Sequence, residues 1–292
     1  MISLYINHKN EFEISNLIKI FFFRDKINIL ENKEEFDKID SNNTIKILSL
    51  IEGDKLKSRI EYKNQNIGFD LDINEVDILE SDQEKRQKIG IRRSLYEALI
   101  KYSGKNMNWG ILTGVRPVKI VHHLQELGYN KQDIRDLLLR EYRLSKEKAE
   151  LIMGIADLEK DIIYPLDKNR YSLYIGIPFC PTRCSYCSFT SNRYDEKLAD
   201  KYLDYLEYEI KRVSELLIDK KLNTVYIGGG TPTALNLQQL DRLLKKLKEN
   251  FPIENKEFTV EAGRPDTIDR EKLELLREYG VNRISINPQT MN

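Results

Sequence analysis

Cysteine and histidine are scarce in this chain, and their scarcity limits the chemistry that it can carry. Three cysteines occur in 292 residues, and all of them fall between Cys180 and Cys187. An odd, clustered set of cysteines argues against a disulfide framework and indicates a metal or redox site. The three histidines are His8, His122 and His123, and none of them lies in the segment that holds the cysteines.

A surplus of charge and a long apolar run are also missing. Lys plus Arg and Asp plus Glu number 47 each, so the net charge gives no overall attraction to nucleic acid or to an anionic membrane. The apolar run at 18–23 is too short to cross a bilayer and is interrupted by Lys19, and residues 1–23 lack a signal-peptide pattern. With 40% apolar and 32% charged residues, the chain can bury a core. We therefore expect a folded cytoplasmic protein with no nucleic-acid or membrane partner.

The first 166 residues predict a small α/β unit and then a set of helices. Residues 1–83 are expected to form the α/β unit, whose role the sequence does not reveal, and residues 84–166 the helical segment. A domain border is expected at residues 164–167. The expected elements are strands at 2–6, 44–51 and 56–62, and helices at 13–23, from 84 to 104, from 117 to 128, from 131, and from 145 toward 161.

Residues 167–292 alternate between strands and helices. The expected strands lie at 172–177, 224–227, 257–261 and 283–286, and the helices between them at 196–217, 237–247 and 269–279. This β-α-β-α-β-α-β order is typical of a parallel sheet with crossover helices. Because ligands bind at the carboxyl ends of the strands in such folds, the motifs that follow each strand are the candidate site.

Cys180, Cys184 and Cys187 follow directly after the first of these strands, with the spacing Cys-x-x-x-Cys-x-x-Cys. Thiolates are the usual ligands of iron–sulfur clusters. Three of them on four irons keep one iron open to the amino and carboxylate groups of a cofactor. A zinc site would need a fourth ligand such as histidine, and a reactive or buried trio of cysteines is the other alternative. The spacing and the position at a strand end favour the cluster.

Three further motifs follow the next strands. Gly228-Gly229-Gly230-Thr231-Pro232-Thr233 comes after the second strand, where glycine lets a ligand approach the backbone closely. Glu261 ends the third strand, and a charged group there is costly without a partner, which favours a site role over a solvated turn. Gln289 follows the fourth strand.

The cysteine loop resembles that of the radical SAM superfamily, whose pattern Cys-x-x-x-Cys-x-aromatic-Cys binds a [4Fe–4S] cluster and S-adenosylmethionine. Tyr186 stands at the aromatic position, which implies that it packs near the adenine. The glycine motif resembles the element that grips the amino group of the methionine moiety. The resemblance implies no side chain as a catalytic acid or base. The positions that it implies for holding S-adenosylmethionine are Tyr174, Tyr186, Gly229, Gly230, Thr231, Glu261 and Gln289.

Longer motifs are similar to the oxygen-independent coproporphyrinogen III oxidase branch of this superfamily. They are Tyr-x-x-Ile-Pro-Phe-Cys at 174–180, Gly-Gly-Gly-Thr-Pro-Thr at 228–233 and Asn-Arg-Ile-Ser-Ile at 282–286. Residues 109–117, 261–267 and 287–291 are similar to its HemZ-type coproporphyrinogen dehydrogenases in particular.

This resemblance implies an oxidative decarboxylation without oxygen. The reduced cluster splits S-adenosylmethionine, and the resulting 5′-deoxyadenosyl radical takes a hydrogen from a propionate side chain of coproporphyrinogen III. Loss of carbon dioxide and one electron leaves a vinyl group, and two rounds yield protoporphyrinogen IX. The implied partners are a tetrapyrrole substrate and a low-potential electron donor such as flavodoxin or ferredoxin.

The sequence departs from the best-studied oxidases at two positions. Gly176 stands where they have histidine, and Phe189 stands where they have a further cysteine. Heme-handling relatives without oxidase chemistry also lack that cysteine, so a heme-binding or heme-transfer role is the alternative. An RNA-modifying radical enzyme of the methylthio-transferring type usually needs a second set of cysteines, and a neutral net charge gives it no support.

Barrels of the radical SAM superfamily are built from six βα units, whereas four strands are expected here. The expected fold is therefore α/β, a partial radical SAM (βα) barrel with its first four strands only, preceded by the small α/β unit and the helical segment. We expect such a chain to bind a cluster better than it turns over substrate.

A substrate with several carboxylates predicts arginines in its pocket. Arg264 and Arg116 are the candidates, and a structural ion pair is the competing interpretation of each. His122 and His123 would point in different directions from one helix and so do not form a pair of metal ligands. Trp109 is interpreted as an anchor in the core.

Overall fold

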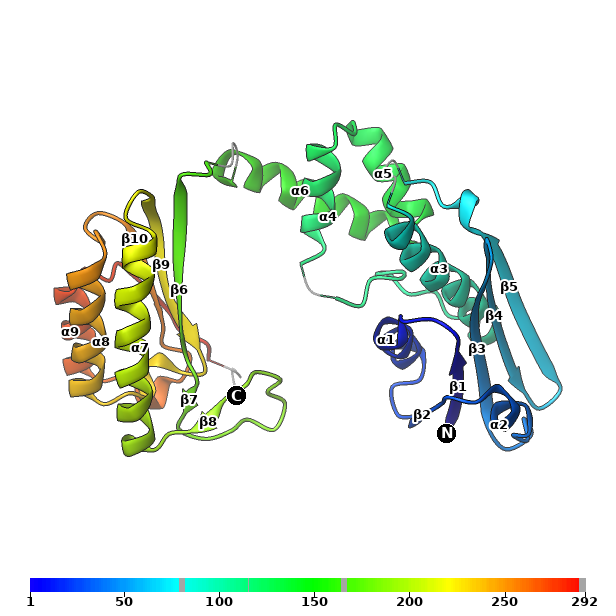
Figure 1. The fold of residues 1–292 in the computed structure, drawn as a ribbon, viewed down its shortest axis with the longest axis horizontal. Helices are drawn as coiled ribbons and strands as arrows, with labels where there is room; N and C mark the ends of the chain where they lie inside the picture. Colours follow the sequence, from blue (N-terminus) through cyan, green and yellow to red (C-terminus); the bar gives the residue numbers. More distant parts are fainter. Residues whose placement is uncertain (79–81, 115, 164–166, 289–292) are drawn as a thin grey trace. The chain divides into compact units, whose positions relative to one another are not determined.

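The computed structural model describes residues 1–78, 82–114, 116–163 and 167–288, and it divides into two compact units (Figure 1). The first unit spans Met1–Tyr164 and the second spans Pro165–Asn292. No helix in the described part of the chain combines the length and the apolar character that a bilayer span requires.

A five-stranded sheet forms one layer of the first unit, in the order β2-β1-β3-β4-β5. β1 pairs in parallel with β2 and β3, and β3, β4 and β5 form an antiparallel meander. The predicted first strand and hairpin are confirmed, whereas β2 and β5 were not predicted. β2 has only four residues, whereas β5 carries an alternation of Ile67, Phe69 and Leu71 that could have predicted it. The bounds are β1 Ile2–Ile6, β2 Ile27–Leu30, β3 Ile45–Glu52, β4 Lys55–Tyr62 and β5 Gln65–Asp72.

The helices of this unit begin and end where the local sequence supplies caps. Asp82 caps the first turn of α3 by accepting hydrogen bonds from the backbone of Glu84 and Lys85, and Gly104 ends the helix in the left-handed conformation, with φ of 67°. The predicted helices are confirmed, and the short α2 is an addition. The bounds are α1 Glu11–Phe21, α2 Lys33–Asp37, the 3₁₀ turn η1 Ile73–Glu75, α3 Gln83–Ser103, α4 Val118–Glu126, α5 Lys131–Arg140 and α6 Lys146–Ile163.

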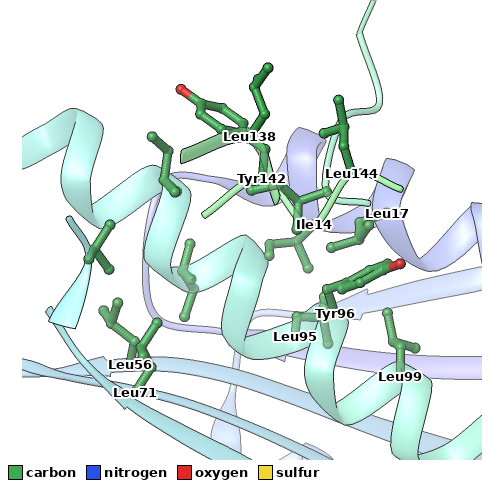
Figure 2. Packing of buried hydrophobic residues seen from close by; sticks show 14 of the residues in the cluster. Ile14, Leu17, Leu56, Leu71, Leu95, Tyr96, Leu99, Leu138, Tyr142 and Leu144 are labelled. Carbon is green, nitrogen blue, oxygen red and sulfur yellow. The ribbon is translucent and has the colours of Figure 1, made fainter. Parts of the chain in front are cut away.

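α3 and the sheet share one hydrophobic core. Ser94 Oγ lies 3.2 Å from the carbonyl oxygen of Leu56 on β4 and 2.9 Å from that of Phe69 on β5. Figure 2 shows side chains of α1, of α3, of the sheet and of the segment after α5 gathered in the same cluster. The border expected between residues 83 and 84 therefore does not separate two compact units, because α3 covers the apolar face of the sheet that precedes it.

The second unit is a sheet of parallel strands with helices on one face, as Figure 1 shows. The strand order β11-β10-β9-β6 follows the sequence, and every pairing is parallel. This confirms the α/β fold with parallel strands that is expected of a partial radical SAM barrel. The bounds are β6 Arg170–Ile177, α7 Glu196–Leu216, β9 Lys221–Gly229, η2 Pro232–Ala234, α8 Leu237–Asn250, β10 Glu257–Glu261, η3 Pro265–Thr267, α9 Arg270–Glu278 and β11 Arg283–Ser285.

Amphipathic helices hold this sheet in place. α8 begins at a capping box between Asn236 and Gln239, and its four inward leucines, Leu240, Leu243, Leu244 and Leu247, are fully buried. At about 25 cal/mol per Å² of apolar surface, a fully buried leucine contributes roughly 1.5–3 kcal/mol relative to an exposed one. This layer fixes the sheet rigidly, so the loops at the strand ends are presented from a firm support.

Candidate functional site

A cavity of about 410 Å³ lies at the carboxyl ends of β6, β9 and β10. The loops after these strands line it, as the parallel topology predicts. We call it the thiol cavity. Its lining includes Tyr174, Cys180, Cys184, Tyr186, Cys187, Gly229, Gly230, Thr231 and Glu261. Every site residue expected from the sequence except Gln289 therefore faces one space, and Gln289 lies outside the described residues.

The cysteine loop is anchored at its start and open beyond it. Phe179 and Cys180 form the two-residue strand β7, which pairs in parallel with β8, Asn192–Arg193. Phe179 is buried, and its ring meets those of Tyr194 and Tyr202 edge to face, with centroids 6.5 and 5.6 Å away. The three cysteines are free and half-buried. The thiols are thus held by a rigid base and remain accessible from the cavity.

The donors at the thiol cavity are three free thiols, and no histidine is among its described lining residues. A structural zinc site takes four protein ligands, mostly thiolates and imidazoles. Thiolates are the usual ligands of iron–sulfur clusters. The donor set fits an iron–sulfur cluster better than zinc.

The glycine motif forms the wall beside Cys180. The backbone of Gly230 donates to the carbonyl of Ile177 at 2.8 Å, and that of Thr231 donates to the carbonyl of Phe179 at 2.7 Å. The hydroxyl of Thr231 lies 3.5 Å from Cys180 Sγ. A Cβ on Gly230 would lie 2.7 Å from the Phe179 carbonyl oxygen and 2.9 Å from Cys180 Sγ. Only glycine fits there without moving the cysteine loop.

Glu261 is the acidic group of the thiol cavity, and both of its oxygens have donors. The hydroxyl of Tyr226 donates to Oε1 at 2.7 Å, and the backbone N–H of Gly229 donates to Oε2 at 3.1 Å. Burial, and then Glu261, raise the pKa of Tyr226 to about 12, so this phenol remains a donor at neutral pH. These two protein donors satisfy the carboxylate and fix it against β9, and its role as a ligand of a cofactor stays a prediction.

Tyr174 lies against the same acidic group. Its ring stacks on that of Tyr226 with centroids 5.8 Å apart and planes 11° apart, because the two residues are register partners on β6 and β9. Burial raises the pKa of Tyr174, and the nearby Glu261 adds to the effect. Tyr174 is 64% exposed, so the face of its ring that is turned away from Tyr226 can contact a ligand.

Tyr186 and Arg264 lie on either side of Cys184. Tyr186 is 71% exposed, and its pKa is raised chiefly by a hydrogen bond with the Cys184 side chain. Arg264 forms a bidentate ion pair with Asp266, with donor–acceptor distances of 2.9 and 2.7 Å, and donates to Thr182 Oγ1 at 3.0 Å. Arg264 therefore fits the ion-pair interpretation, although it also lines the cavity.

Several residues that line or support the thiol cavity were not expected from the sequence. Tyr226, which supports Glu261, was missed because a tyrosine in a strand is usually a core residue, and its register beside Tyr174 is a feature of the folded sheet. Asn287 could have been found, because it follows β11 by two residues as the other site residues follow their strands. The remaining unexpected lining residues are Thr182, Ser188, Phe189 and Gly263.

Three other residues considered in the sequence analysis lie in the first unit. His122 is buried on α4, and its Nε2 lies 2.9 Å from Glu159 Oε2. Trp109 packs against the hydrophobic core, as predicted, and has Lys148 Nζ 5.1 Å from its ring centroid. Arg116 is not among the residues that line the thiol cavity, so its place in a substrate pocket stays a prediction.

Comparisons with known proteins agree with this site. Residues 174–292 match the Radical SAM superfamily. The oxygen-independent coproporphyrinogen-III oxidase-like protein HemZ of Bacillus subtilis is 39% identical over 222 residues, which cover 73% of this chain and 44% of that protein. The heme chaperone HemW of B. subtilis is 42% identical over 123 residues, and these cover 41% of this chain and 32% of HemW.

Further matches belong to the same group. The oxygen-independent coproporphyrinogen III oxidase of Escherichia coli K12 is 40% identical over 132 residues, which cover 44% of this chain and 28% of the enzyme. A solved structure of coproporphyrinogen III oxidase (HemN) from E. coli, a radical SAM enzyme, matches with a TM-score of 0.40 and 36% identity, over 47% of this chain and 32% of that chain. The chain thus spans less than half the length of these relatives.

Proposed function

We propose that this chain, whose residues 174–292 match the Radical SAM superfamily and which is similar to its coproporphyrinogen oxidase-like branch, serves the oxygen-independent oxidative decarboxylation of coproporphyrinogen III to protoporphyrinogen IX. The superfamily uses a [4Fe–4S] cluster together with S-adenosylmethionine. One observation carries the proposal: three free thiols, a glycine wall and an anchored glutamate face the same cavity.

Cys180, Cys184 and Cys187 would hold the cluster. Their thiols are accessible from the thiol cavity, and the described residues around them offer no fourth thiol. One iron would therefore stay available to the amino and carboxylate groups of S-adenosylmethionine. When bound, the cluster and S-adenosylmethionine supply the low-potential electron and the hydrogen-abstracting radical that oxidation without oxygen requires.

The other cavity residues would orient S-adenosylmethionine. Gly229, Gly230 and Thr231 present backbone at close range, because glycine offers no side chain that would keep a ligand away. Glu261 is held by two donors and presents a fixed negative charge to a cationic group. The exposed faces of Tyr174 and Tyr186 suit contact with a flat ring, and Gln289 is proposed as a further contact.

This division of roles requires no protein acid or base. The cavity residues would bind, orient and exclude water, while the electron would come from a low-potential donor such as flavodoxin or ferredoxin. Arg264 is engaged by Asp266 and Thr182, so it would stabilise the cavity wall beside Cys184 more than it would bind a substrate carboxylate. The cysteine that the best-studied oxidases have at position 189 is a phenylalanine here, and its side chain is 69% exposed at the cavity.

That phenylalanine favours heme binding or heme transfer as the second candidate function. An exposed aromatic ring offers a surface on which a tetrapyrrole can stack, whereas a thiol at this position is a reactive group. A relative named as a heme chaperone also covers 41% of the chain at 42% identity. In this alternative the thiol cavity would still bind the cluster and S-adenosylmethionine, but no vinyl product would form.

One experiment separates these functions. The chain is reconstituted without oxygen, reduced, and incubated with S-adenosylmethionine, with and without coproporphyrinogen III. Formation of 5′-deoxyadenosine that rises with coproporphyrinogen and is accompanied by a vinyl product supports the oxidase. Cleavage of S-adenosylmethionine without product, together with stoichiometric heme binding in a spectroscopic titration, supports heme transfer. A chain that takes up no iron would refute both.

A further inference from the structure

A second cavity, of about 380 Å³, lies within the first unit and belongs to no function assigned so far. The start of α3, loop residues 112–114, 116 and 117, the start of α4, and Tyr142 line it. The loop is part of the segment 109–117 that resembles the HemZ type. We call this space the basic cavity.

Five cationic side chains line the basic cavity: Lys85, Lys88, Arg92, Arg116 and Lys119. No Asp or Glu is among the described residues that line it. Lys88 pairs with Glu84 at 3.0 Å on the solvent side of α3. Within the described part of the chain, no carboxylate lies at ion-pair distance from Arg92, Arg116 or Lys119. Arg92, Arg116 and Lys119 therefore bring positive charge to the cavity without a carboxylate at ion-pair distance among the described residues.

Arg92 is half-buried at the edge of the basic cavity, and its fork is available to a ligand. Its Nε donates to the carbonyl oxygen of Lys88 at 3.0 Å, which leaves the terminal nitrogens for another acceptor. Desolvation lowers its pKa, and Tyr142 and Glu13 raise it only in part. A partly desolvated guanidinium with free terminal nitrogens is suited to bind a carboxylate.

The backbone at the mouth of the basic cavity points to the same conclusion. Arg116 has φ of 64°, in the left-handed region, although it is not glycine and precedes a proline. Such conformations cost of order 1–3 kcal/mol and cluster at ligand-binding sites. α4 begins directly after it with no side-chain cap and no acidic residue in its first turn. The positive end of that helix thus adds to the field of the cations.

The rest of the wall is apolar. Ile89 is buried at its base, and Leu112, Ile120 and the ring of Tyr142 complete the lining. Tyr142 also packs in the core cluster that Figure 2 shows. A small inorganic anion would use the cations only and leave this apolar surface uncovered. A ligand with acidic groups on an apolar body would use both.

We propose that the basic cavity is a binding site for a small polycarboxylate with an apolar body. The choice of a tetrapyrrole with propionate groups as that ligand rests on the proposed function, whereas the site itself does not. Arg92 would bind one carboxylate through its fork, and Arg116 and Lys119 would meet others from the strained loop and the first turn of α4.

The test is a titration of the full chain with coproporphyrin III, the stable oxidised form, followed by its fluorescence. Arg92→Gln should raise Kd about tenfold, because a charge-assisted hydrogen bond is lost. Arg92→Lys should recover part of this affinity. Lys119→Gln, at an exposed position where folding is not at risk, should raise Kd about threefold. Lys146→Gln, which removes the same charge from an exposed position on α6, is the matched control and should leave Kd unchanged.

Two outcomes overturn the proposal. One is that all four variants bind coproporphyrin III as the unaltered chain does. The other is that tripolyphosphate binds with the same dependence on Arg92 and Lys119 and displaces the porphyrin, which would assign the cavity to phosphate groups. The titration is repeated in a chain with all three cysteines replaced by serine, so binding to the basic cavity is measured where the proposed cluster cannot form. Cleavage of S-adenosylmethionine is assayed separately, so failure of one proposal is distinguishable from failure of the other.

Discussion

The thiol cavity and the basic cavity differ in how their charged side chains are satisfied. In the thiol cavity, Glu261 receives two donors and Arg264 is paired with Asp266, so the charges are balanced within the protein. In the basic cavity, the described residues supply no carboxylate to Arg92, Arg116 or Lys119. The groups that remain open are thiols in the first case and cations in the second.

This difference indicates what each cavity binds. In the thiol cavity the charged side chains are already paired, so the groups that remain available are the sulfurs, and thiolates are metal ligands. In the basic cavity, Arg92, Arg116 and Lys119 have no carboxylate at ion-pair distance among the described residues, so a bound anion would lower their free energy. The two units also differ in what requires a glycine. Gly230 makes room beside a thiol, whereas Gly90 on α3 makes room for the core side chains Leu56 and Val76.

The largest expected effect concerns the thiols. Cys180→Ser, Cys184→Ser or Cys187→Ser should lower the iron content of the anaerobically reconstituted chain from about four per chain toward zero, since each thiolate would hold one corner of the cluster. Formation of 5′-deoxyadenosine should be lost with it. Ser185→Ala, in the same loop, is the control and should retain iron. Unchanged iron content in the cysteine variants would contradict the assignment of the thiol cavity to metal.

The second expected effect concerns the glycine wall. Gly230→Ala should lower the free energy of unfolding by about 1–3 kcal/mol and reduce iron retention, because its Cβ would press on Cys180 and on the Phe179 carbonyl. Gly263 lines the same cavity, and Gly263→Ala is the control, because the added Cβ would meet only Asn287 Nδ2 at 3.5 Å. Chemical denaturation and iron analysis of both variants test this. Equal losses in the two would mean that the close approach at Gly230 is not what positions the loop.

A third pair of variants examines the support of the basic cavity. Gly90→Ala should destabilise the first unit by about 1–3 kcal/mol, because its Cβ would collide with Leu56 and lie 2.9 Å from Val76 Cγ2. Gly154→Ala on the exposed face of α6 meets nothing within 4 Å and should stabilise by about 0.5–1 kcal/mol through helix propensity. Thermal unfolding distinguishes opposite signs. A stabilising Gly90→Ala would contradict the shared core of α3 and the sheet.

A smaller effect is expected at Tyr226. Tyr226→Phe removes the donor to Glu261 Oε1 and should cost about 1 kcal/mol in the free energy of unfolding at neutral pH. Tyr171→Phe on β6 is the matched control, because the ring of Tyr171 packs on Phe251 and its hydroxyl makes no hydrogen bond within the described residues. Its cost should stay within about 0.5 kcal/mol. Urea denaturation of both variants gives the comparison.

The smallest expected effect is the pH dependence of the same contact. The pKa of Tyr226 is raised from 10.0 to about 12 by burial and by Glu261, so the folded state holds the phenolic proton more tightly than the unfolded state does. Its contribution to stability is therefore fully present below pH 10.0 and is lost as the pH rises toward about 12. Tyr226→Phe should show a shallower decline over this window. An equal decline of the free energy of unfolding in both proteins would mean that Tyr226 is not the source of this pH dependence.

Much of the second unit could be predicted from local patterns. The four parallel strands and their helices are confirmed, because apolar periodicity and caps such as Asn236 act over a few residues. In the first unit, β2 was not predicted because it has only four residues, and β5 was not predicted although Ile67, Phe69 and Leu71 alternate along it. Residues on both sides of the border expected after residue 83 lie in one compact unit, since the apolar face of α3 does not reveal from the sequence which layer it will cover.

By itself, the sequence determined the spacing of the three thiols and the order of strands that carries them, because both depend on residues close together along the chain. Only the tertiary structure decided that Tyr226 holds Glu261 from a neighbouring strand, and that Arg92, Arg116 and Lys119 meet around one apolar floor. Tyr226 and Glu261 are 35 positions apart, and Arg92 precedes Arg116 and Lys119 by 24 and 27 positions. Whether they come together depends on the register of the strands and the packing of helices, which local periodicity does not encode.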